Sequence, residues 1–319
     1  MKLANFELDG KPCLGAVRGN LIVNLPLAFD MVVNRLVKFE SKTTRSKARH
    51  LIIESRQPAG EMLELIQRDQ IWLLALEEIL SGVIERYDAD LEFDRLFIPL
   101  GAARLLAPIP RPGKIICVGR NYAEHARERG SAVPSQPIYF LKSINTICGP
   151  GDPIRLPPNS NQVDYEAELA VVMGRGGKQI PEEKAYEHIA GYLILNDVSA
   201  RDMQGADKQW FRGKSCDTFA PIGPWIVTTE EIPDPHILRI SLTLNGQTMQ
   251  DSNTANMIFK IPYLVSYLSQ SLTLEPGDII STGTPEGIGA GRTPPIFLKS
   301  GDTVSISIEK IGTLTNPVV

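Results

Sequence analysis

Three acidic side chains alternate along residues 163–172 of this 319-residue chain. They are Asp164, Glu166 and Glu168 in the segment VDYEAELAVV. On a β-strand, residues two positions apart point to the same face, so these carboxylates would line one face together. Carboxylates that lie this close repel one another unless a proton or a cation lies between them. Because oxygen-only ligands favour Mg²⁺, Mn²⁺ or Ca²⁺ over zinc, the pattern indicates a divalent-metal site.

A further carboxylate, Asp197, follows about 30 residues later. It ends the apolar segment LILND, where an expected strand meets a loop. A second interpretation stays open from the pattern alone. Glu166 and Glu168 could form the solvated face of an edge strand, and Asp197 could cap a helix.

A candidate base lies upstream, in the segment GRNYAEHARE (119–128). His125 and Glu128 are three residues apart, which places them on one face of a helix. Glu128 would orient His125 and raise its basicity, so that the imidazole could activate a water molecule. The alternative is an ordinary ion pair on a charged surface helix that also carries Arg127 and Arg129.

The elements that must position these groups are mostly short β-strands. β-branched segments bounded by Gly, Pro, Asn or Asp recur from residue 114 onward: KIICVG, ELAVVMG, YLILND, WIVTT, ISLTLNG, DIISTG and DTVSISIEKIG. Asn245 and Gly246 form a strong two-residue hairpin signal. Helices are expected only after Asn121, near 182–190 and near 254–270. Many strands with few helices favour a closed or rolled sheet over an alternating βαβ fold.

The N-terminal part of the chain has a different pattern. Residues 1–25 predict a small antiparallel meander, with turns at Asp9-Gly10 and at Arg18-Gly19-Asn20. Residues 26 to about 90 are expected to be mainly helical. An apolar stripe at three- and four-residue spacing supports this expectation: Leu73, Leu76, Leu80, Val83, Ile84 and Tyr87.

A proline-rich segment separates the two parts. Pro108, Pro110 and Pro112 cannot continue a helix or a central strand. We therefore predict an N-terminal domain over 1–108 and a catalytic domain over 109–319.

Composition and charge exclude several classes of protein. The chain is 43% hydrophobic and 22% charged, its net charge is −4, and no run of Lys or Arg suits a nucleic-acid partner. Its four cysteines contain no CxxC pair, which argues against a disulfide scaffold or a zinc site. We see no signal peptide, and the longest apolar runs are far shorter than the roughly 20 residues that cross a membrane. A cytoplasmic protein without a membrane partner is expected.

Seven collinear motifs show that the chain resembles the fumarylacetoacetate hydrolase family. They cover about 110–319: GRNYAEHARE, VDYEAELAVVMG, GYLILNDVSARDMQ, RGKSCDTFAPIGP, TLNGQTMQDSNTANMIF, LEPGDIISTGTPEGIG and LKSGDTVSISIEKIGTLTNPV. The resemblance implies an α+β fold with a mainly β catalytic domain, a mixed β-sandwich roll of the family's C-terminal type. A smaller α/β N-terminal domain would precede it. It also implies a homodimer that binds Mg²⁺ or Mn²⁺, with Ca²⁺ as a substitute in crystals.

The resemblance also implies roles for individual residues. Glu166, Glu168 and Asp197 would be the metal ligands, and Asp164 would support them rather than bind the metal. Lys214 would bind a substrate carboxylate or stabilise oxyanion charge, and the role of Lys142 stays open. Further substrate contacts would come from Arg120, Tyr122, Gln204 and Thr284.

The chemistry implied is that of small 2-oxo acids. Such an acid can chelate a hard cation, which stabilises the enolate left when an adjacent C–C or C–H bond breaks. The His125–Glu128 pair favours a hydrolase that cleaves a C–C bond in 3-acylpyruvates such as fumarylpyruvate or acetylpyruvate, a step of aromatic catabolism. The alternative is a decarboxylase or isomerase of 2-oxo acids, acting on oxaloacetate or on aromatic meta-cleavage intermediates. A non-catalytic metal-binding scaffold is disfavoured because the constellation is intact.

Overall fold

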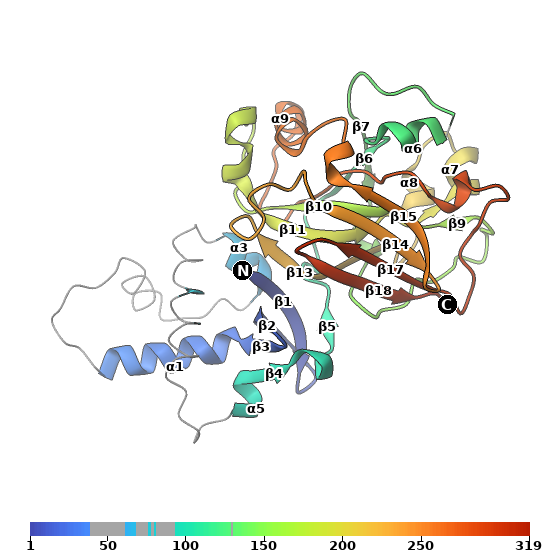
Figure 1. The fold of residues 1–319 in the computed structure, drawn as a ribbon. Helices are drawn as coiled ribbons and strands as arrows, with labels where there is room; N and C mark the ends of the chain where they lie inside the picture. The colour runs from blue at the N-terminus through green and yellow to red at the C-terminus, as the bar shows by residue number, and fades with distance from the viewer. Residues whose placement is uncertain (39–60, 68–75, 78–79, 81–92, 129) are drawn as a thin grey trace. The chain divides into compact units, whose positions relative to one another are not determined.

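The computed structural model describes residues 1–38, 61–67, 76–77, 80, 93–128 and 130–319. They form two compact units, Met1–Arg104 and Leu105–Val319 (Figure 1). The domain limits expected from the proline-rich segment, 1–108 and 109–319, stay a prediction. Within the expected helical stripe, Leu76 and Leu80 are described and buried. Leu73, Val83, Ile84 and Tyr87 lie outside the described residues.

The first unit begins with the expected meander. Strands β1 (Lys2–Leu8), β2 (Lys11–Arg18) and β3 (Leu21–Asn24) pair antiparallel, and β4 (Phe97–Pro99) adds to β3. Asp9 and Gly10 both have positive φ, as a tight two-residue hairpin turn requires. The helices described here are α1 (Leu25–Lys38), α3 (Met62–Gln67) and α5 (Phe93–Leu96).

The second unit contains a mixed sheet and an antiparallel sheet. The mixed sheet runs β13-β11-β10-β16-β6-β7, with β16 parallel to β6. Its strands are β6 (Ile115–Gly119), β7 (Ile138–Lys142), β10 (Ala167–Met173), β11 (Ile189–Asn196), β13 (Ala220–Thr228) and β16 (Ile279–Ser281). The antiparallel sheet runs β15-β14-β17-β18: β14 (Arg239–Leu244), β15 (Gln247–Asn253), β17 (Thr303–Ile308) and β18 (Gly312–Pro317).

These two sheets pack face to face, because β10 contacts β14, β11 contacts β17 and β13 contacts β18 (Figure 1). Strands β14 and β17 alternate buried and partly exposed residues, whereas β10 is buried along its whole length. The core therefore lies between the sheets. Asn245 and Gly246, both at positive φ, close the β14–β15 hairpin. The mainly β, α+β fold with a mixed sandwich is confirmed.

Short elements complete the second unit. They are strands β5 (Leu105–Leu106), β8 (Ile147–Cys148), β9 (Val163–Asp164) and β12 (Ser199–Ala200), and helices α6 (Ala123–Glu128), α7 (Arg201–Ala206), α8 (Phe211–Lys214) and α9 (Ile261–Ser271). The segment near 182–190 forms a 3-10 helix, Glu182–His188, instead of an α-helix. α9 begins later than expected, because Pro262 fits only the first turn of a helix. In the part of the chain that the structure describes, no helix combines the length and apolar character needed to cross a membrane.

Candidate active site

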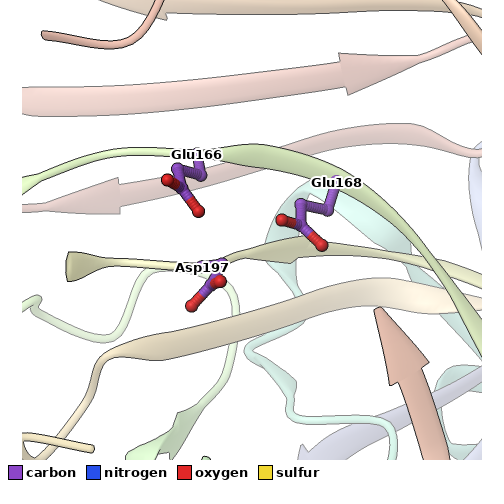
Figure 2. A group of neighbouring side chains, drawn as sticks. All are labelled: Glu166, Glu168 and Asp197. Carbon is purple, nitrogen blue, oxygen red and sulfur yellow. The ribbon is translucent and has the colours of Figure 1, made fainter. Parts of the chain in front are cut away.

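The three predicted metal ligands meet in the mixed sheet. Glu166 lies just before β10, Glu168 lies within it, and Asp197 directly follows the neighbouring strand β11 (Figure 2). One carboxylate oxygen from each side chain lies within 4.8 Å of the others. Glu166 is 5% exposed, Glu168 1% and Asp197 0%. This burial excludes the interpretation of a solvated edge-strand face.

Asp164 departs from the expected pattern. The strand is interrupted at residues 165–166, and Asp164 belongs to β9, which pairs with β12 in a separate two-stranded sheet. The expectation that all three alternating carboxylates line one face is therefore wrong for Asp164. Its carboxylate accepts hydrogen bonds from the backbone N–H groups of Gly289 (2.8 Å) and Ala290 (3.0 Å) and from Nε of Arg201 (2.9 Å).

Two of the three clustered carboxylates are paired with buried cations. Nζ of Lys214 donates to Glu166 at 2.7 Å and to Asp197 at 2.6 Å. Nζ of Lys142 donates to the second oxygen of Asp197 at 2.6 Å, and Arg201 donates to the second oxygen of Glu166 at 2.7 Å. Burial by itself would raise the pKa of Glu166, but Lys214 and Arg201 hold that pKa well below its ordinary value.

Glu168 is in a different environment. It accepts hydrogen bonds from the Ser281 hydroxyl and from the N–H of Gly283, and within residues 105–128 and 130–319 no cation pairs with it. Burial, followed by the charges of Asp197 and Glu166, raises the pKa of Glu168 well above its usual range. A further positive charge at this place would favour its ionised form.

The donor set therefore fits a divalent cation such as Mg²⁺ or Mn²⁺. All the candidate ligand atoms are carboxylate oxygens, which hard cations prefer. With Glu168 ionised, as a bound cation would favour, four buried carboxylates would face three buried protein cations, and the fourth negative charge would be the cation's: Asp164, Glu166, Glu168 and Asp197 against Lys142, Lys214 and Arg201.

The candidate base belongs to helix α6. His125 is 6% exposed, so the pair is not an ordinary surface pair. Its Nδ1 lies 3.5 Å from Oε2 of Glu128, whose other oxygen accepts a hydrogen bond from the N–H of Gly287 at 3.1 Å. Glu128 thus holds the loop that follows β16 and lies beside the imidazole.

A cavity of about 160 Å³ contains most of the predicted site residues. An engineered apolar cavity of about 150 Å³ holds a benzene molecule, so this one suits an acid of about four to six carbons. The predicted residues that line it are Arg120, His125, Glu166, Glu168, Gln204, Lys214 and Thr284. The predicted site residues Glu128, Asp197 and Tyr122 do not line it. The hydroxyl of Tyr122 is buried and makes no hydrogen bond to the described residues.

Other residues of the site had no predicted role. Arg201 bridges Asp164 and Glu166, and Lys142 binds Asp197. Trp210 and Phe140 line the cavity. Arg201 could have been found, because a cation four residues after Asp197 at a strand–helix junction suits a buried acidic cluster. The backbone N–H groups of segment 283–290 that bind the carboxylates could not have been found, because residue types do not show where a backbone N–H group points.

The chain belongs to the fumarylacetoacetate hydrolase family. A family model described as "Fumarylacetoacetate (FAA) hydrolase C-terminal" matches residues 114–319. The chain is 43% identical to oxaloacetate tautomerase fahd2, mitochondrial, of Xenopus laevis, over 89% of this chain and 90% of the relative. It is 41% identical to oxaloacetate tautomerase YisK of Bacillus subtilis (strain 168), over 90% of this chain and 96% of the relative.

Solved structures share the fold over the full length of the chain. Fumarylacetoacetate hydrolase of Exiguobacterium antarcticum has a TM-score of 0.76 at 34% identity, and covers 100% of this chain and 99% of its own. Maleylpyruvate hydrolase of Sphingobium sp. SYK-6, in complex with manganese(II) and pyruvate, has a TM-score of 0.72 at 28% identity with the same coverage. The chain is thus an enzyme of this family with a buried acidic triad suited to a divalent metal.

The relatives correct the expected reaction. Cleavage of acylpyruvates is wrong as the main interpretation, because relatives that match about nine-tenths of the chain are oxaloacetate tautomerases. These findings favour the alternative, an isomerase of a 2-oxo acid. The error has a physical cause: the acidic triad, Lys214 and His125 are the kind of groups that an enolate requires, and cleavage, decarboxylation and tautomerisation share an enolate. Residues that stabilise this intermediate do not distinguish among the three reactions.

Proposed function

We propose that the protein interconverts the keto and enol forms of oxaloacetate. The observation that carries the proposal is that His125 and Lys214 share one cavity with the buried carboxylates, in a chain that aligns over 89% of its length with an oxaloacetate tautomerase. In this reaction a proton leaves the methylene carbon and a proton joins the 2-oxo oxygen. No carbon–carbon bond breaks and no water is consumed, so a base and a source of positive charge suffice.

The carboxylate cluster supplies the place for that positive charge. Glu166, Glu168 and Asp197 would hold a divalent cation, and the chemistry it would supply is withdrawal of electron density from the 2-oxo group, which would make the neighbouring C–H bond more acidic.

Lys214 acts as a fixed donor. Two of its three N–H bonds are directed to Glu166 and Asp197, which leaves one N–H for the substrate. Burial would lower the pKa of Lys214, but Asp197 and Glu166 raise it above its ordinary value. The side chain therefore stays an ammonium that binds a carboxylate or the 2-oxo oxygen, rather than acting as a base.

His125 moves the proton. Because Glu128 lies beside Nδ1, it favours a proton on that nitrogen and leaves Nε2 as the acceptor. Nε2 takes the proton from the methylene carbon and, in its protonated form, returns a proton to the oxygen. Because Lys214 and Glu168 are almost fully buried, the inner end of the cavity excludes most of the water that would compete for the proton.

The test follows the enol form of oxaloacetate by its ultraviolet absorbance as it relaxes to equilibrium. The Mn²⁺-loaded protein should accelerate this relaxation beyond Mn²⁺ alone, and EDTA should remove the acceleration. Release of CO₂ from oxaloacetate and cleavage of acetylpyruvate are measured in parallel. If either of those reactions is faster than tautomerisation, the proposal is wrong.

We also propose that the protein works as a homodimer. The family resemblance supports this, and light scattering on the purified, metal-loaded protein tests it. A monomeric mass would refute it.

A further inference from the structure

One cationic side chain that lines the cavity has no carboxylate partner among the described residues. Three Lys and Arg side chains line the cavity in the described part of the chain: Arg120, Arg201 and Lys214. Arg201 and Lys214 bind the buried carboxylates. Arg120 forms no hydrogen bond and no ion pair with any described residue, so its guanidinium is available to a ligand.

The guanidinium of Arg120 is held by an aromatic side chain instead. Its Cζ lies 5.7 Å from the ring centre of Trp210, a cation–π distance. Phe140 meets the same ring edge-on, with the ring centres 5.2 Å apart. Gly119 precedes Arg120 and leaves room for this ring, because a Cβ there would lie 2.5 Å from a ring carbon of Trp210.

The backbone also fixes the direction of Arg120. Its φ of 58° lies in the left-handed region, which residues other than glycine seldom adopt. Such a conformation persists only where the surrounding structure maintains it, and it is commonest at binding and catalytic sites. Arg120 is thus positioned by its backbone and by an aromatic platform.

The cavity has a buried end and an open end. Lys214 is 2% exposed and Glu168 1%, whereas Arg120 and Trp210 are only half-buried. A 2-oxo acid that binds with its 2-oxo group at the carboxylate cluster would direct its remaining carbons away from that cluster. The distal end of the acid then reaches the half-buried rim where Arg120 lies.

We propose that Arg120, held against Trp210, binds the carboxylate of the substrate that is distal to the 2-oxo group. The site thereby selects short 2-oxo dicarboxylates over 2-oxo monocarboxylates of the same length. This inference rests on the proposed function, since it assigns which end of oxaloacetate each part of the cavity binds.

The expected selectivity follows from the chemistry of the pair. A guanidinium offers a planar fork of N–H donors that matches a carboxylate, and it is half-shielded from water here. Charge-assisted hydrogen bonds of this kind discriminate by about tenfold to a hundredfold. A methyl group in place of the distal carboxylate would leave the guanidinium without a partner.

The test compares two unreactive acids that differ only at that position, L-malate and L-2-hydroxybutyrate. Their dissociation constants are measured by calorimetry on the Mn²⁺-loaded protein. Wild type should bind L-malate about tenfold to a hundredfold more tightly. Arg120→Gln should abolish this preference by weakening L-malate alone, and Arg120→Lys should retain part of it. The matched control is Arg239→Gln, which removes the charge of an exposed arginine that pairs with Asp251; it should behave as wild type.

Each outcome separates the two proposals. If wild type binds both acids equally, or if Arg120→Gln weakens both acids by the same factor, the assignment of Arg120 is wrong. If the preference is present and depends on Arg120 but no tautomerase activity is found, the proposed function fails and this assignment stands. If wild type binds neither acid, the assignment of Arg120 fails, and the tautomerase assay decides the proposed function by itself.

Discussion

The two ends of the cavity are built in opposite ways. At the buried end, Lys214, Lys142 and Arg201 are each bound to a protein carboxylate at 2.6–2.7 Å. At the rim, Arg120 has an aromatic platform but no anionic partner among the described residues. Both ends carry positive charge in the same site, yet only the rim leaves a cation's charge unpaired.

The difference reflects how much each charge would cost without a partner. An ion removed from water is destabilising by several kcal/mol unless another charge and further hydrogen bonds replace the water. The buried cations therefore need permanent partners, and their carboxylates gain a fixed geometry in return. A half-buried guanidinium keeps part of its hydration, so it is stable without an anionic partner in the protein until a ligand binds. The buried end is thus suited to positioning and the rim to selection.

The largest expected effect comes from two substitutions that each replace one buried carboxyl group by an amide. Asp197→Asn leaves Lys142 and Lys214 without a carboxylate they share, and should lower the free energy of unfolding by about 3–5 kcal/mol. Glu168→Gln removes the carboxylate that lacks a cation and retains an oxygen for Ser281 and Gly283. It should leave stability without metal unchanged or raised. Urea unfolding in EDTA measures both.

Both variants should nevertheless lose the rise in melting temperature that Mn²⁺ gives to wild type, and with it the tautomerase activity. The difference in stability between the two variants tests the pairing of the buried charges. If Glu168→Gln is destabilised as strongly as Asp197→Asn, the buried charges are not paired as described. If either variant keeps the full Mn²⁺ shift, its carboxylate is not a ligand.

The same contrast shows which parts of the site could be predicted from sequence. Local sequence patterns were enough to predict much of the fold. Short-range rules predict the strand segments, the hairpin at Asn245 and Gly246, and the strand end at Asp197. The E-x-E spacing placed Glu166 and Glu168 together because β10 keeps them near β11. Such features can be predicted because they depend only on residues that are close in the sequence.

The remainder depends on contacts between distant segments. Asp164 left the predicted face because its carboxylate binds the backbone of Gly289 and Ala290, about 125 residues away. The partner of Lys142 is Asp197, 55 residues further along the chain. No spacing rule encodes such pairs. The role of Tyr122 as a substrate contact stays a prediction, with its side chain buried outside the cavity lining.

The reaction was the hardest inference for a different reason. Sequence patterns identified groups of the kind that an enolate requires, and Glu166, Glu168, Lys214 and His125 line one cavity. What separates tautomerisation from cleavage is whether a water molecule is admitted and activated. The identity of His125 does not encode this difference, because an imidazole can accept a proton from carbon or from water.

The next largest effect on activity is expected at His125, which we assign neither to metal binding nor to recognition of the distal carboxylate. His125→Gln should lower tautomerase turnover by about 10²–10⁴-fold, because it removes the proton-transfer group. The Mn²⁺ shift and the affinity for L-malate should stay those of wild type, since neither end of the cavity is changed. Loss of the Mn²⁺ shift in this variant would mean that His125 supports the metal site instead.

Glu128→Gln serves as a matched comparison for His125. The amide keeps an oxygen for the N–H of Gly287 but removes the charge beside Nδ1. Turnover should fall less than in His125→Gln, because the imidazole that transfers the proton is still present. A loss as large as that of His125→Gln would identify Glu128 itself as the proton acceptor.

The smallest expected effect tests the rim. In Gly119→Ala the added methyl group would meet Trp210 at 2.5 Å, so the ring must move and its contact with Arg120 weakens. Since a partly exposed cation–π contact is worth about 0.5–1 kcal/mol, affinity for L-malate should fall by about two- to fivefold. Because Gly119 itself lines the cavity, the readout is the preference for L-malate over L-2-hydroxybutyrate, which should fall by that factor while any loss common to both acids cancels. Gly101→Ala, where the methyl group meets no atom within 4 Å, is the control. An equal loss for both acids would show that the ring supports the cavity as a whole, and the division between a positioning end and a selecting rim would no longer hold.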